Sequence, residues 1–96
     1  MTTPRYSRTA RADLAAIADH IARDNPTRAR SFIRELRDHC RLVARQPKVM
    51  RLREEFGADV RAAIHADYLI LYTERDGRVF IERVVHGARD LGVADR

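Results

Sequence analysis

The chain has 96 residues, of which 45% are apolar and 34% are charged, and its net charge is +5. This length suits one small domain over residues 1–96, and the apolar content excludes a disordered chain. The single cysteine, Cys40, excludes an internal disulfide framework and a cysteine-based zinc site. The sequence contains no apolar run long enough to span a membrane and no signal peptide, so we expect a cytoplasmic protein.

Arginine dominates the charge of the chain. Every basic residue except Lys48 is an arginine, and the guanidinium group binds phosphate and carboxylate through paired hydrogen bonds. A basic chain of this kind indicates an anionic partner, either nucleic acid or an acidic protein. Because GC-rich coding DNA also produces a chain rich in arginine and alanine, the composition by itself leaves both interpretations open.

A short strand is predicted at residues 4–6, followed by a helix. Ser7 can cap this helix, because its side-chain oxygen can accept a hydrogen bond from a free backbone amide. The apolar residues of the helix recur at helical spacing; they are Ala10, Leu14, Ile17, Ala18 and Ile21. Asn25 and Pro26 then suit the cap and the first position of a second helix, which predicts a tight junction between the two.

The second helix is predicted over residues 26–45. Gln46-Pro47 ends it, because a residue before proline disfavours the helical region. The apolar stripe of this helix consists of Ala29, Phe32, Ile33, Leu36, Cys40 and Val43. The position of Cys40 on this stripe predicts a buried core residue and not a nucleophile.

The second half of the chain predicts three strands. Residues 49–59 are mixed and predict a loop with a turn at Gly57. A half-buried strand should follow, since apolar Val60, Ala62 and Ile64 alternate with Arg61, Ala63 and His65.

The last two strands are predicted to form a hairpin. Residues 68–73 are apolar without interruption, which predicts a central strand covered on both faces. Asp76-Gly77 is a hairpin signal, and residues 78–86 form the final strand before Gly87 turns the chain. The element order β-α-α-β-β-β predicts an α+β fold in which a helical hairpin packs on one face of a mainly antiparallel sheet.

A ridge of arginines is predicted on the second helix. On a helical wheel, five arginines share a sector of roughly 80° beside the apolar stripe; they are Arg30, Arg34, Arg37, Arg41 and Arg45. Glu35 and Asp38 on the same helix can reduce part of the repulsion between these arginines, and Arg34 and Asp38 have the i,i+4 spacing of an ion pair. The ridge is either a solvated face or a docking surface for an acidic partner, and Leu42, outside the stripe, is a candidate exposed contact.

One set of residues could support catalysis. Arg61 begins the second strand, and Arg83 and His86 end the last one. Together they could bind a phosphate and transfer a proton during RNA cleavage. However, Arg83 and His86 are an odd number of residues apart, so a regular strand directs them to opposite faces. The alternative interpretation places Arg83 in a salt bridge and His86 at the cap of a turn. The sequence shows no pattern for a metal or organic cofactor, so we expect none.

The chain resembles the ParE toxins of type II toxin–antitoxin systems over about residues 5–91. The most specific stretch is Arg83-Val84-Val85-His86-Gly87-Ala88-Arg89-Asp90. Weaker stretches in matching order are Tyr6-Ser7, Ala12-Asp13-Leu14, Ile21-Ala22-Arg23-Asp24-Asn25-Pro26, Phe32-Ile33, Gln46-Pro47, Val60-Arg61 and Tyr68-Leu69-Ile70-Leu71-Tyr72.

The resemblance implies a function that composition alone does not. ParE toxins are regarded as inhibitors of DNA gyrase that block replication and arrest growth. A ParD-like antitoxin neutralises them: its C-terminal segment wraps the toxin, and its N-terminal module binds DNA, so the toxin meets operator DNA only indirectly. The resemblance thus implies a toxin that is not an enzyme. We expect antitoxin contacts along the arginine ridge and Leu42, and target contacts at Arg83, His86 and Arg89.

Two other functions stay open. ParE toxins are similar in fold to RelE ribonucleases, which cleave messenger RNA on the ribosome. Those enzymes use lysines before the second strand and usually a tyrosine near the C-terminus. Here Arg51 and Arg53 stand in the place of the lysines, no tyrosine follows Tyr72, and His86 would have to substitute. The second alternative is a non-toxic binding module that keeps the fold without the activity.

Overall fold

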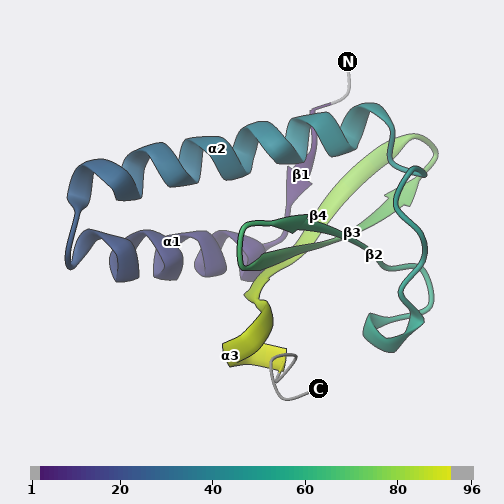
Figure 1. Ribbon diagram of the computed structural model, residues 1–96. Coiled ribbons are helices and arrows are strands. Elements are labelled where there is room, and N and C mark those ends of the chain that lie inside the picture. Colours follow the sequence, from purple (N-terminus) through teal and green to yellow (C-terminus); the bar gives the residue numbers. More distant parts are fainter. Residues whose placement is uncertain (1–2, 92–96) are drawn as a thin grey trace.

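The computed structural model describes residues 3–91. In chain order its elements are β1 (Arg5–Tyr6), α1 (Arg8–Ala22), α2 (Pro26–Arg45), a 3₁₀ turn η1 (Glu54–Phe56), β2 (Arg61–His65), β3 (Tyr68–Arg75), β4 (Arg78–His86) and α3 (Gly87–Leu91). Figure 1 shows α1 and α2 lying side by side as a hairpin, with the sheet beside them. Except for η1 and α3, these elements are the ones predicted from the sequence.

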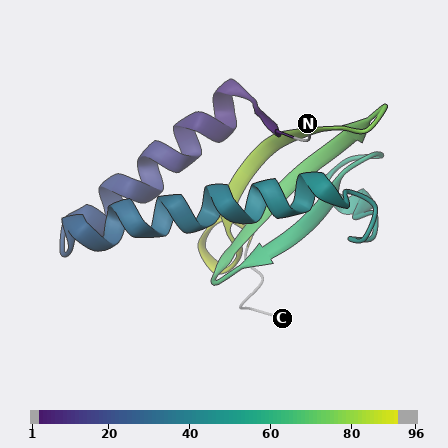
Figure 2. The same ribbon diagram turned by 90° about the horizontal axis from the view of Figure 1, so that it is seen from above.

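The helical hairpin begins and turns at the predicted caps. The Ser7 hydroxyl accepts a hydrogen bond from the Ala10 amide at 2.9 Å, and the Asn25 side chain accepts one from the Arg28 amide at 3.0 Å. Pro26 stands at the start of α2, where its missing N–H costs nothing. The joint between α1 and α2 extends beyond the sheet (Figures 1 and 2).

The four strands form one mixed sheet in the order β1-β4-β3-β2. β1 pairs with β4 in parallel, and the other two pairs are antiparallel. The β3–β4 hairpin closes at Asp76 and Gly77, whose φ angles of 54° and 80° fit the predicted two-residue turn. The expected mainly antiparallel sheet is therefore confirmed.

A β-bulge at Glu82 changes the facing of side chains along β4. Leu71 pairs with Arg83 and Tyr72 with Ile81, so Glu82 is the extra residue. As a result Ile81 and Val84, three residues apart, both belong to the core beneath the helices. The Glu82 backbone oxygen also accepts a hydrogen bond from the Ser7 hydroxyl at 2.8 Å, which ties the start of α1 to the bulge.

Both faces of the sheet are covered at its centre. The face toward α1 and α2 carries the main core, whose largest fully buried side chains are Tyr72, Leu36, Ile70, Ile81 and Cys40. The opposite face carries a smaller cluster of Ala62, Leu69, Leu71 and Val85, with Phe56 and Val60 packed on it. Residues 68–73 of β3 are consequently all buried, as predicted for a central strand.

Two predictions for residues 49–65 need correction. The loop contains the short helix η1, whose end at Gly57 has a φ of 143°. The predicted alternation in β2 is wrong at Ile64, which is 69% exposed, whereas Ala62 and Ala63 are both buried. Ile64 shares with Ala62 the face of β2 that points away from the helices, and the residues packed on this face, Phe56 and Val60, cover the cluster of Ala62 without including Ile64. No helix within residues 3–91 is long and apolar enough to cross a membrane.

Candidate functional site

The five arginines of the predicted ridge are all exposed on α2. Two of them have partners within the chain: Arg41 forms an ion pair with Asp38, and the Arg37 guanidinium lies 5.0 Å from the centre of the Tyr6 ring. The predicted ion pair between Arg34 and Asp38 is wrong, because Asp38 pairs with Arg41, three residues later in α2. Among the residues that the structure describes, Arg30, Arg34 and Arg45 form no ion pair, so the ridge keeps free positive charge.

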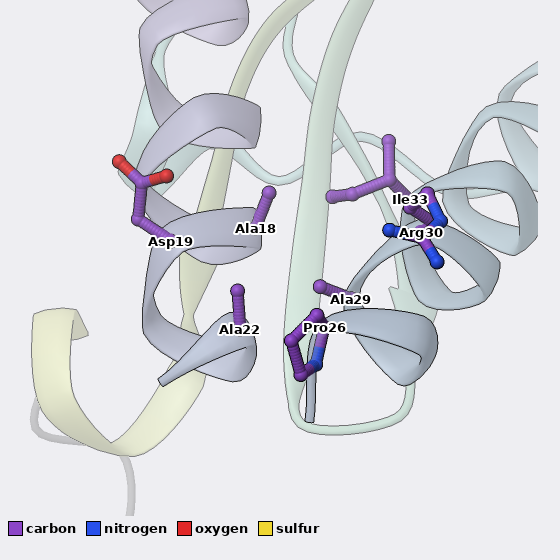
Figure 3. A pocket seen from close by; sticks show the side chains of 7 residues that line it. All are labelled: Ala18, Asp19, Ala22, Pro26, Ala29, Arg30 and Ile33. Atoms are coloured by element: carbon purple, nitrogen blue, oxygen red, sulfur yellow. The ribbon is translucent and has the colours of Figure 1, made fainter. Parts of the chain in front are cut away.

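A shallow apolar groove lies between the two helices, next to the ridge. It has a volume of about 410 Å³. Figure 3 shows the small side chains of Ala18 and Ala22 on α1 facing Ala29 and Ile33 on α2, with Arg30 at the margin. Because these side chains are short, the groove offers apolar surface, with Asp19 of α1 on one wall and Arg30 of α2 on the other.

Leu42 lies on the other flank of α2, away from Arg30 and Arg37. It is 59% exposed and lines a second groove with His39, Val49 and Met50 on the side of the helix that meets β2. The predicted antitoxin-binding set therefore covers two flanks of one helix, and a partner that touches both must cross over α2.

Arg83 is bound to α1 by an ion pair. Its Nε atom lies 2.8 Å from Asp13 Oδ2 and its second guanidinium nitrogen 3.1 Å from Oδ1. Asp13 Oδ2 also accepts the backbone amide of Val84 at 2.9 Å, beyond the point where β1 ends its pairing with β4. The hydrogen bond with Asp13 raises the pKa of the Arg83 guanidinium above its ordinary value. The salt-bridge interpretation of Arg83 matches this geometry.

His86 caps α3. Its Nδ1 accepts a hydrogen bond from the Arg89 amide at 3.1 Å, and its own amide donates to Asp90 at 2.7 Å. These reciprocal bonds have the form of a capping box, so the Nδ1 atom is already engaged. The ring also meets the Tyr68 ring edge-on, with 5.1 Å between the centres. The interpretation of His86 as the cap of a turn therefore matches the geometry.

The structure does not bring Arg61 to Arg83 and His86. Arg61 pairs with Tyr72, whereas His86 pairs with Tyr68, which lies four residues earlier in β3. Four residues of strand span about 13 Å. Arg61 instead donates a hydrogen bond to the Met50 backbone oxygen and holds the preceding loop. The three residues are thus occupied separately, in three structural contacts.

Arg83 and Arg89 do share a small polar pocket beside α1. The pocket measures about 280 Å³, and its wall includes Asp13, His20 and Tyr68. Of the predicted target-binding set, Arg89 is exposed and Arg83 is 48% exposed in its side chain. The two arginines are therefore neighbours on the surface, with the guanidinium of Arg83 restrained by Asp13.

Sequence reasoning missed a pair of histidines. His39 on α2 and His65 on β2 approach with 3.0 Å between their Nδ1 atoms, and the His65 ring lies edge-on against Phe32. Burial and the nearby His65 lower the pKa of His39 below its ordinary value. Since 26 residues separate the two histidines, the sequence held no spacing signal; only the packing of α2 on β2 brings them together.

Comparison with known proteins identifies the family. The family model described as "ParE toxin of type II toxin-antitoxin system, parDE" matches residues 5–91, which is nearly the whole chain. The chain belongs to the ParE toxin family. The resemblance found in the sequence is therefore confirmed at the level of the family.

A solved structure shares the fold of this ParE toxin. It is titled "Chromosomal ParDE TA system from P. aeruginosa", and it matches with a TM-score of 0.76 at 19% identity, covering 90% of this chain and 96% of that one. The curated proteins contain no match. At this identity the structural match supports the α+β, ParE-like architecture and says nothing about individual site residues.

Within this ParE toxin, the segment from Arg83 to Asp90 has a structural role in every contact described above. It ends β4, anchors that strand to α1 and caps α3. Of the charged side chains in the segment, Arg83 is paired with Asp13 and Asp90 accepts a hydrogen bond from His86, whereas the exposed side chain of Arg89 has neither contact among residues 3–91.

Proposed function

We propose that this ParE toxin inhibits DNA gyrase, thereby arrests replication and growth, and acts by binding and not by catalysis. Residues 83–90, where the sequence resemblance is most specific, are engaged in structural contacts, and the candidate catalytic residues Arg61, Arg83 and His86 do not form one cluster. Arg61 is separated from His86 by about 13 Å of strand. A ribonuclease needs its proton-transfer and charge-stabilising groups around one phosphate. This dispersal is the observation that favours binding.

Purified toxin, gyrase and supercoiled plasmid test the proposal directly. We expect gyrase-dependent linear DNA or a loss of supercoiling activity as toxin is added. The parallel reaction contains translating ribosomes and messenger RNA, which we expect to stay intact. Cleaved messenger RNA with unaffected gyrase would establish the RelE-like alternative. Expression without an antitoxin that leaves growth unchanged would instead indicate a non-toxic binding module.

Arg89 and its neighbour Arg83 are our candidates for contact with the target, together with His86 at the same end of β4. Arg89 is the most informative of the three, because it is exposed and forms no ion pair among the described residues. We expect Arg89→Ala to reduce gyrase inhibition with no loss of stability. Arg75→Ala, at the distant hairpin end, serves as the matched control.

We also propose that a ParD-like antitoxin neutralises the toxin by passing along the arginine ridge and Leu42. Four of the five ridge arginines, all except Arg41, form no ion pair among residues 3–91, and the groove beside Arg30 is lined mainly by apolar side chains. Such a surface complements a tail that combines carboxylates with apolar side chains. DNA would meet this assembly through the antitoxin, in the cytoplasm where gyrase acts.

Charge reversal tests the antitoxin path. The triple change Arg34→Glu, Arg37→Glu and Arg41→Glu should weaken the complex with the antitoxin encoded beside the toxin by at least about tenfold, which is ~1.4 kcal/mol. The control triple reverses three other exposed arginines, Arg11, Arg75 and Arg78, and keeps the net charge of the variants equal. Equal weakening by both triples would indicate a general charge effect, and no weakening by the first would exclude the ridge.

A further inference from the structure

The contact between His39 and His65 joins α2 to β2 and has no role in the proposed function. His39 lies on α2, one turn before Leu42 and Val43, and His65 ends the outer strand β2. Their Nδ1 atoms are 3.0 Å apart, so one nitrogen donates a proton and the other accepts it. Once this shared proton is displaced, the lone pairs of both Nδ1 atoms are available to one metal ion. We propose that His39 and His65 chelate a late first-row divalent cation such as Cu²⁺ or Zn²⁺.

The distance between the nitrogens suits chelation. Bonds from imidazole nitrogen to zinc measure about 2.0–2.1 Å, and two such bonds across the observed 3.0 Å enclose an angle of roughly 94° at the metal. This angle is that of adjacent ligands in the tetragonal geometry of Cu²⁺. A tetrahedral Zn²⁺ site needs a separation near ~3.3 Å, which a small rotation of the two rings provides. We therefore expect Cu²⁺ to bind more tightly than Zn²⁺, in the general order of divalent affinities.

The surroundings restrain one ring and leave access to the other. The His65 ring is held edge-on against Phe32, with 5.5 Å between the ring centres. His39 borders the open groove that Leu42 and Met50 line, through which a cation can enter. Imidazole ligands restrained before binding lose less conformational freedom when the metal arrives.

Glu35 supplies no third ligand to the pair. It lies one turn before His39 on α2, and its carboxylate is bound to Arg28 at 2.8 Å. No group of three or more histidine, cysteine or acidic side chains is gathered for a metal within residues 3–91. The site therefore has two protein donors, and water or a donor from a partner completes the coordination.

Metal titration of the full-length toxin tests the proposal. Zn²⁺ and Cu²⁺ are titrated separately in a buffer that does not chelate them, and binding is followed by calorimetry. His39→Gln and His65→Gln should each weaken binding by at least tenfold. His20→Gln is the matched control, because His20 is exposed on α1 and takes no part in the contact between His39 and His65. Binding that is unchanged in the first two variants, or lost equally in the third, overturns the proposal.

A second measurement needs no substitution and so does not depend on the folding of the variants. In the unmodified toxin, substoichiometric Zn²⁺ should shift the ring resonances of His39 and His65 and leave those of His20 and His86 in place. The melting temperature should also rise with Zn²⁺ and return to its original value with a chelator, because a ligand that binds only the folded state stabilises it. Shifts confined to His20 or His86, or no shift at all, refute the site.

Discussion

The Asp13 carboxylate on α1 holds both the Arg83 guanidinium and the Val84 amide of β4. These two bonds have different surroundings, because the Arg83 side chain is 48% exposed and that of Asp13 only 15%. Solvent screens the ion pair, whereas the amide of Val84 is part-buried and lies beyond the residues of β4 that pair with β1. Asp13 therefore contributes to the fold more than Arg83 does.

Substitutions at the two ends of this ion pair should differ in stability. We expect Asp13→Ala to lower the free energy of unfolding by about 1–3 kcal/mol, since a charged hydrogen bond to a half-buried amide is lost. Arg83→Ala should cost about 0–1 kcal/mol, the usual range for a screened ion pair. Urea denaturation of both variants and of the double variant measures the difference. A larger loss for Arg83→Ala than for Asp13→Ala would contradict this assignment.

Leu42→Asp should weaken the complex with the antitoxin and leave the toxin stable. The side chain is 59% exposed, so its removal should change the free energy of unfolding by no more than about 0.5 kcal/mol. We expect the dissociation constant of the complex, measured by calorimetry, to rise by at least about tenfold. Ile64→Asp is the control, since Ile64 is also exposed but lies on β2. Equal effects of the two changes would argue against a contact specific to Leu42.

Two glycine substitutions should differ in their cost. Gly57 has a φ of 143°, and an added Cβ would lie 2.9 Å from Val60 Cγ2, so we expect Gly57→Ala to destabilise the fold by about 2–3 kcal/mol. Gly77 has a φ of 80° with open space around it, so Gly77→Ala should cost only about 1 kcal/mol. Thermal melts of both variants measure the order. The reverse order would mean that the loop before β2 tolerates backbone change.

Cys40 should react slowly in the folded toxin. Its side chain is 1% exposed, and burial raises the pKa of the thiol above its ordinary value. Because the thiolate is the reactive form, labelling by a thiol reagent at pH 8 should be at least about a hundredfold slower in buffer than in urea. Cys40 is the only cysteine, so the absorbance of the released product reports this site alone. Equal rates in both solvents would show that α2 opens readily.

Local patterns in the sequence predicted most of the elements. Ser7 and Asn25 cap their helices because capping depends on a side chain and an amide three residues away. Asp76-Gly77 closes the hairpin for the same local reason. The prediction for Ile64 was wrong because exposure depends on whether another element lies over that position, and the loop residues Phe56 and Val60 pack on the cluster of Ala62 and not on Ile64.

The candidate site was predicted less completely than the fold. The sequence placed the five ridge arginines on one side of α2, as the structure has them, since helical periodicity is fixed by the backbone. It could not show that Leu42 lines a groove with Val49 and Met50, because that groove depends on how the loop folds back on α2. Nor could it show that Arg83 pairs with Asp13, 70 residues away, or that Arg61 bonds to the Met50 backbone in the preceding loop.

The sequence alone determined the family, the order of the elements and the ridge on α2, because these depend on residue type and on periodicity along the chain. Tertiary structure alone decided which distant side chains meet. Asp13 reaches Arg83 across 70 residues, and His39 meets His65 across 26. The Glu82 bulge also shifts which residues of β4 face the core. Such contacts arise from the packing of α1 and α2 on the sheet, and no spacing within one segment encodes them.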